Sequence, residues 1–244
     1  MIVLSAGMPR AGTAWHYNLI CDLMATNGCA DAGEIRVKYR LQDILTETYC
    51  NIGTLSVRRL GRAAIPALMG NTFAIKTHTG PTRASRLLQR LGLLRVLYLY
   101  RDPRDAMLSA FEYGREGLQT GRLNAFSHLT DFDKSLSFIM EYVRIWERWS
   151  QEKGVLLCRY EDLLTKYDHE VTRLIGFLPV NGTRPEVRDV TEQYRPRAAQ
   201  GREGLHFHKG RVGRFRESFN MQERSILLEQ LAPYLPRMGY EVEP

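Results

Sequence analysis

Two glycines and an arginine near the N-terminus are well suited to hold a phosphate group. In residues 7–15, Gly-Met-Pro-Arg-Ala-Gly-Thr-Ala-Trp, an apolar strand runs through a turn into a helical pattern. Backbone N–H groups of such a loop point into one concavity, where the helix dipole also favours an anion. The spacing of Gly7 and Gly12 matches the front half of a P-loop, but Thr and Ala replace the Lys and Ser or Thr expected next. Arg10 supplies the cation instead, which predicts a phosphorylated ligand handled without a metal.

A lysine and a histidine two residues apart have the types needed for proton transfer and charge stabilisation. Lys76 and His78 close the apolar segment Phe-Ala-Ile-Lys-Thr-His of residues 73–78, which predicts a strand. Because side chains alternate along a strand, both should face the same point. Histidine accepts protons near pH 7, and lysine stabilises charge that grows on a transferring group. A lone histidine is more often structural, but the neighbouring lysine and the phosphate loop favour a catalytic role.

The chain has 244 residues and a formal net charge of +7, and much of its basic character lies in one segment. Residues 195–216 hold seven Lys and Arg against one Glu, which suits a clamp on a compact polyanion better than a nucleic-acid surface. No apolar run approaches a bilayer span, and the apolar residues 2–7 are too few and lack the basic flank of a signal peptide. The spacing of the four cysteines suits neither zinc nor a disulfide framework. We therefore expect a soluble cytoplasmic protein without a metal, a nucleic-acid partner or a membrane partner.

Apolar strands alternate with amphipathic helices along the whole chain, which predicts a single α/β domain over residues 1–244 with a central parallel sheet flanked by helices. The expected strands are residues 2–7, 73–78, 94–100 and 154–160. The expected helices are residues 13–26, 103–113, 133–152, 161–177 and 220–231, with irregular helices and loops over 31–70. A further helix is expected after Thr82 as its cap, with leucines at positions 87, 88 and 91. Polar clusters follow each strand, at residues 10–13, 76–78, 101–105 and 160–162. Since ligands bind at the carboxyl ends of parallel strands, these clusters should converge on one site.

Five segments in chain order resemble the motifs of sulfotransferases that use 3′-phosphoadenosine 5′-phosphosulfate (PAPS). They are Pro-Arg-Ala-Gly-Thr-Ala-Trp (9–15), Lys-Thr-His (76–78), Tyr-Arg-Asp-Pro-Arg-Asp-Ala-Met-Leu-Ser (100–109), Arg-Tyr-Glu-Asp-Leu (159–163) and His-Lys-Gly-Arg-Val-Gly-Arg-Phe-Arg-Glu-Ser-Phe (208–219). Each segment alone is a weak signal, but five in the family's order are specific. The resemblance implies that PAPS is the co-substrate and that the nucleotide PAP is the product. It also implies a P-loop-like loop that binds the 5′-phosphosulfate of PAPS.

The resemblance also implies a role for each matching residue. His78 would take the proton of the acceptor during in-line transfer, while Lys76 and Arg10 would stabilise charge on the sulfuryl and leaving groups. The cofactor-binding residues would be Arg10, Ala11, Gly12, Thr13, Ala14 and Trp15 at the 5′-phosphosulfate, and Arg101, Ser109, His208, Lys209 and Gly210 at the 3′-phosphate. Tyr160 and Trp15 would pack against the adenine.

Some residues depart from the family's motifs. Ala14 lacks the usual hydroxyl, and Phe215 and Arg216 replace a Trp and a Lys. His208 stands where the family has Arg, so its contact with the 3′-phosphate would weaken as the pH rises past about 6.5. The short dimer motif of the cytosolic members is not matched from Arg216 onward, so the oligomeric state stays open.

The acceptor is the part that the sequence leaves open. Its pocket should come from residues 31–60 and 111–130, and the candidate contacts are Tyr39, Tyr49, Phe111, Tyr113, Phe126 and His128. We expect a small hydroxylated metabolite or natural product, with N-sulfation also open. Two other functions compete: a P-loop kinase or related phosphotransferase that uses ATP and magnesium, and a basic nucleic-acid-binding module without catalysis.

Overall fold

A four-stranded parallel sheet forms the centre of the molecule. The computed structural model describes residues 1–199 and 211–243. The strands are β1 (Ile2–Gly7), β2 (Phe73–Thr77), β3 (Leu94–Tyr100) and β4 (Val155–Arg159), in the order β2-β1-β3-β4. Every residue of β1 and β2 is buried, whereas the edge strand β4 is only half-buried. The predicted parallel α/β sheet is confirmed, and its four strands lie where the apolar runs placed them.

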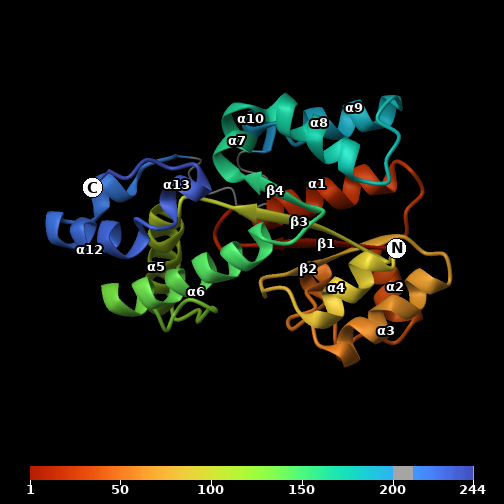
Figure 1. Cartoon of the computed structure of the whole chain (residues 1–244), viewed down its shortest axis with the longest axis horizontal. Helices are drawn as coiled ribbons and strands as arrows, with labels where there is room; N and C mark the ends of the chain where they lie inside the picture. Colours follow the sequence, from red (N-terminus) through yellow and green to blue (C-terminus); the bar gives the residue numbers. More distant parts are fainter. Residues whose placement is uncertain (200–210, 244) are drawn as a thin grey trace.

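Helices cover both faces of the sheet (Figure 1). Helix α1 lies on one face with α8 and α9, while α3, α4 and α6 cover the other. The helices are α1 (Thr13–Ala25), α2 (Ala32–Lys38), α3 (Val57–Leu68), α4 (Arg83–Arg90), α5 (Pro103–Gln119), α6 (Phe132–Ser150), α7 (Tyr160–Thr165), α8 (Tyr167–Phe177), α9 (Pro185–Gln193), α10 (Pro196–Ala199), α11 (Phe215–Ser218), α12 (Met221–Leu231) and α13 (Leu235–Met238), with a 3₁₀ turn η1 (Thr48–Cys50). Each crossover helix therefore returns the chain to the same end of the sheet.

Local signals in the sequence explain where several helices begin. Thr82 caps α4 in a reciprocal capping box with Ser85. Asp102 caps α5, and Pro103 occupies its first turn, where the missing N–H of proline costs nothing. Helix α5 extends to Gln119, six residues beyond the expected end at Tyr113. This extra length carries the helix along the full wall of the cavity described below.

The segment expected as one helix over residues 161–177 is two helices. Helix α7 ends at Thr165, and Lys166 leaves the helical conformation with φ −126° and ψ 40° before α8 begins. Apolar residues on either side of the break still pack into the core, so the periodicity continues through it. The pattern therefore predicted the buried face correctly but missed the kink.

The core lies on both sides of the sheet and includes large aromatic residues. Trp15, Tyr98, Trp146 and Trp149 are all at most 2% exposed. Within residues 1–199 and 211–243, no helix is both long and apolar enough to cross a membrane.

Candidate active site at the carboxyl end of the sheet

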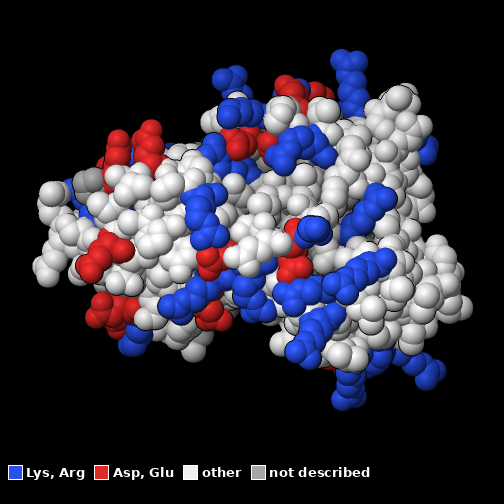
Figure 2. All heavy atoms as spheres, in the orientation of Figure 1, with Lys and Arg blue, Asp and Glu red and all other residues white. Residues whose placement is uncertain are grey.

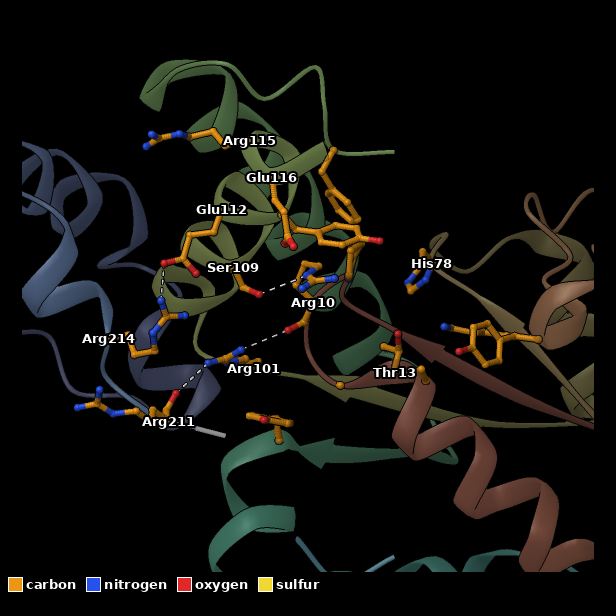
Figure 3. A pocket seen from close by; sticks show the side chains of 18 of the residues that line it. Arg10, Thr13, His78, Arg101, Ser109, Glu112, Arg115, Glu116, Arg211 and Arg214 are labelled. Atoms are coloured by element: carbon orange, nitrogen blue, oxygen red, sulfur yellow. Dashed lines mark hydrogen bonds and ion pairs between the residues drawn. The ribbon is translucent and has the colours of Figure 1, made fainter. Parts of the chain in front are cut away.

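A cavity of about 530 Å³ lies at the carboxyl ends of the strands (Figure 3). It brings together nine of the predicted site residues: Arg10, Gly12, Thr13, Ala14, Lys76, His78, Arg101, Ser109 and Tyr160. Ala11 and Trp15 do not line it. His208, Lys209 and Gly210 lie outside the described residues. The convergence expected from parallel strands is thus present for every described strand end.

The loop after β1 is a tight turn in which two residues have positive φ angles. Gly12 has φ +82°, and a Cβ there would come within 2.8 Å of the Tyr160 ring. Arg10 also has a positive φ, 64°, which is uncommon for a residue with a side chain. The first intrahelical bond of α1 runs from the His16 amide to the Gly12 carbonyl, so the preceding amides have no acceptor within the helix. The N–H groups in the first turn of a helix that follows a tight glycine turn suit an anion.

The Arg10 side chain crosses the cavity toward α5. Its Nε donates to Ser109 Oγ at 3.2 Å, and its guanidinium carbon lies 4.4 Å from the centre of the Tyr113 ring. The Phe126 ring lies on the same side, 5.7 Å away. Burial lowers the pKa of Arg10, but an arginine stays cationic in proteins. Arg10 therefore places a positive charge between the phosphate loop and the helix wall.

Arg101, directly after β3, connects the end of that strand to the loop after β1. Its guanidinium lies 4.8 Å above the Tyr160 ring and donates to the carbonyls of Arg10 at 3.4 Å and Arg211 at 3.1 Å. Its ion pair with Asp105 is long, at 3.4 Å, and its buried Nε has no hydrogen-bond partner among the described residues. Arg101 is thus a cation with donor capacity left over, as expected for a residue that binds an anionic ligand.

Lys76 and His78 face the cavity from the end of β2. The Nδ1 atom of His78 lies 2.7 Å from the Gly7 carbonyl oxygen, which can only accept, so Nδ1 carries the proton of the neutral ring. The Nε2 atom is then left as an acceptor. Burial, helped by the charge of Lys76, lowers the pKa of His78 to about 4. Burial also lowers the pKa of Lys76 to about 8, and its Nζ lies 4.6 Å from the centre of the Tyr49 ring.

A buried carboxylate ties the C-terminal basic segment to this site. Asp105 accepts hydrogen bonds from the backbone amides of Gly213 at 2.7 Å and Phe215 at 3.0 Å. Arg214 pairs with Glu112 on α5, and both line the cavity together with Arg211. The sequence analysis did not assign this role to Asp105. The feature that could have indicated it is the position of Asp105, a second acidic residue four positions after Arg101 in the polar cluster that follows β3.

Trp15 lies below the cavity, not in its wall. Its indole is fully buried, donates through Nε1 to the Tyr194 carbonyl at 3.0 Å and stacks on Tyr167 at an interplanar angle of 15°. It also meets Tyr160 edge-on. The indole therefore packs against Tyr160, which lines the cavity. Direct contact of Trp15 with adenine stays a prediction.

Three of the six acceptor candidates line the cavity: Tyr49, Tyr113 and Phe126. The other three lie elsewhere: Tyr39 accepts from Asn71, Phe111 lines a smaller cavity of about 230 Å³, and His128 packs edge-on against Phe138. The sequence analysis missed four polar lining residues, which are Glu112, Arg115, Glu116 and Gln119, whereas Arg211 and Arg214 belong to the basic segment that it predicted as a clamp. Residues at three- to four-residue spacing after Ser109 would have shown most of them, had α5 been expected to continue to residue 119.

Comparison with known proteins decides the family. The model of the sulfotransferase domain family matches residues 2–225. The chain belongs to this family. The sulfotransferase fold also appears in solved structures at low sequence identity. Retinol dehydratase with retinol and PAP has a TM-score of 0.62 and 18% identity, with 96% of this chain and 81% of that chain covered.

Two further structures resemble this sulfotransferase chain to the same extent. Retinol dehydratase with androsterone and PAP matches with a TM-score of 0.61 and 17% identity, covering 96% of this chain and 80% of that chain. Mouse sulfotransferase SULT7A1 with PAP matches with a TM-score of 0.61 and 16% identity, covering 96% and 83%. A search of curated proteins finds no match for this chain. At these identities the structures support the shared fold.

Proposed function

We propose that this sulfotransferase transfers the sulfuryl group of PAPS to a hydroxyl group, or to an amine, of a small-molecule acceptor. One observation carries the proposal: the acceptor nitrogen of His78 and the strained phosphate loop line the same cavity. A proton acceptor opposite a phosphate cradle is the arrangement that group transfer from a phosphosulfate to a hydroxyl needs.

The residues present fit PAPS. The amides from Gly12 to Trp15 would hold the 5′-phosphosulfate, and only glycine fits at position 12, where a Cβ would meet the Tyr160 ring. Arg101 and Ser109 would hold the 3′-phosphate, and the unpartnered Nε of Arg101 indicates unused donor capacity. The adenine would lie against Tyr160. The PAP bound in the related structures supports this choice of nucleotide.

Protonation states in the free protein suit this chemistry. With a pKa of about 4, His78 is neutral at pH 7 and its Nε2 can take the proton of the acceptor. With a pKa of about 8, Lys76 is mostly charged at pH 7 and can stabilise charge on the sulfuryl oxygens. An anionic co-substrate beside Lys76 would offset its charge and raise the basicity of His78.

The competing functions have less support. A kinase would need a lysine and a magnesium-binding hydroxyl after Gly12, where this chain has Thr13 and Ala14. A nucleic-acid-binding module without catalysis would not explain why Lys76 and His78 line the same cavity as the phosphate loop.

Transfer of radiolabelled sulfate from PAPS to a panel of phenols, alcohols and amines tests the proposal. We expect His78→Ala to lower kcat by about 100- to 10,000-fold, as for loss of a general base. His128→Ala is the matched control, because His128 does not line the cavity, and it should stay within about twofold of the wild type. Equal losses in both variants, or transfer that is insensitive to His78, would contradict the role of His78.

A further inference from the structure

The longest stretch without an acidic residue contains Lys76, His78 and Arg101 of the active site and also two α-helices outside its motifs. Residues 48–101 contain nine Lys and Arg and no Asp or Glu. The other 25 basic residues of the chain do not outnumber its 27 acidic ones, so this stretch accounts for the positive net charge. It includes helices α3 and α4, which pack against each other at one edge of the molecule (Figure 1).

The exposed side of α3 is apolar. Val57 is 77% exposed, Ile65 49%, Leu68 69% and Met69, directly after the helix, 67%. At 3.6 residues per turn, positions 57, 65, 68 and 69 fall within about a third of the helix circumference, with Arg58 alongside. Large aliphatic side chains gathered on one exposed helix side indicate a surface that binds something.

Helix α4 continues this character. Leu87 is 56% exposed and Leu91 is 61% exposed, and the exposed arginines Arg83, Arg86 and Arg90 alternate with them. Six of the twelve large hydrophobic side chains that are exposed among the described residues therefore lie on or next to these two helices. Figure 2 shows Lys and Arg side chains separated by uncharged surface over the region of α3 and α4.

The chemistry of this α3–α4 face, defined by the exposed residues of both helices, selects its partner. Among the described residues, Arg58, Arg83 and Arg90 form no ion pair, so their forks are available to bind phosphate. Arg62 pairs with Asp43 and Arg86 with Glu152, so the unpaired arginines give the face its positive charge. Aliphatic side chains between arginines match an anionic phospholipid surface, into which apolar side chains insert while cations meet headgroups. An acidic protein is the other class that the charge allows, but exposed aliphatic side chains spread over both helices favour a continuous anionic surface into which several of them can insert.

We infer that the α3–α4 face docks the protein onto anionic phospholipid bilayers. This inference departs from the sequence expectation of no membrane partner, which rested on the lack of a spanning segment. Docking is peripheral and does not depend on the transfer reaction, so it stands or falls separately from the proposed function.

Vesicle co-sedimentation of the full chain tests this inference. Vesicles of phosphatidylcholine with about 30 mol% phosphatidylglycerol should bind the protein, and binding should weaken as salt rises from about 0.05 M to 0.5 M. Each arginine near the surface is worth about fivefold in partitioning, so Arg58→Gln/Arg83→Gln/Arg90→Gln should lower it on the order of 100-fold. Leu68→Ser/Leu87→Ser should lower it at least about tenfold through lost insertion.

The matched control is Arg122→Gln/Leu123→Ser, which removes an exposed arginine and a leucine that is 76% exposed, outside the α3–α4 face. The control should bind anionic vesicles within about fivefold of the wild type, which is the change in partitioning expected from the loss of one arginine. Equal binding to pure phosphatidylcholine, no binding at all, or an equal loss in the control would overturn the inference. Light scattering that shows a dimer, lost in Leu68→Ser/Leu87→Ser, without vesicle binding would assign the face to a second copy of the chain instead.

Discussion

Replacing Lys76 by glutamine should raise the pKa of His78 without restoring its ordinary value. In the wild type, burial and the charge of Lys76 together lower this pKa from 6.5 to about 4, and burial is the larger cause. The difference corresponds to about 3 kcal/mol against the protonated ring. The variant removes only the charge, so the pKa of His78 should rise above about 4 but stay below 6.5.

Imidazole NMR titration of the ligand-free protein measures this directly. The chain has six histidines, and His78→Gln identifies the signals of His78. The neutral ring should carry its proton on Nδ1, because the Gly7 carbonyl accepts from that atom. Lys134→Gln, which removes an exposed lysine on α6, should leave the titration of His78 unchanged. A wild-type pKa near 6.5, or the same pKa in Lys76→Gln, would refute the electrostatic reasoning.

Three further outcomes follow from packing and burial. Gly12→Ala would force a side chain into φ +82° and against the Tyr160 ring, so calorimetry should show PAP affinity at least about tenfold weaker, with Ala11→Gly as the mild control. Gly114→Ala would place a Cβ 2.2 Å from the Phe126 carbonyl oxygen, so chemical denaturation should show a loss of about 1–3 kcal/mol. Burial lowers the pKa of His16 from 6.5 to about 3, so the unfolded state takes the proton first and Tm should fall as pH drops below about 6.5; His16→Gln should flatten that dependence.

The sheet was predictable because its strands are short apolar runs followed by polar residues. All residues of β1 and β2 are buried, and a short, continuous apolar run is typical of such a fully buried strand. Helix length was less predictable, because α5 is amphipathic only weakly beyond Tyr113 and is held there by the loop that packs on its glycines. A Cβ on Gly114 would meet the backbone of that loop at Phe126, a contact between residues separated in the sequence that no local pattern encodes.

The part of the site that was predictable consists of charged or titratable residues at the end of a strand or directly after it. Lys76, His78 and Arg101 lie at strand ends, and parallel topology brought them to one cavity. The role of Asp105 was not predictable, because its partners are backbone amides more than a hundred residues away. The burial of Trp15 was missed for a similar reason, since Tyr194 and Tyr167, which cover it, come from segments far along the chain.

Calorimetric titration of the protein with PAP and with ATP, both in EDTA, tests the central claim most directly. The account predicts PAP binding and little ATP binding, because the contacts proposed for Arg101 and Ser109 need the 3′-phosphate that ATP lacks. Arg101→Gln should weaken PAP binding by about 10- to 100-fold, the value of a charge-assisted hydrogen bond. ATP binding that depends on added magnesium, without PAP binding, would contradict the account and favour the kinase.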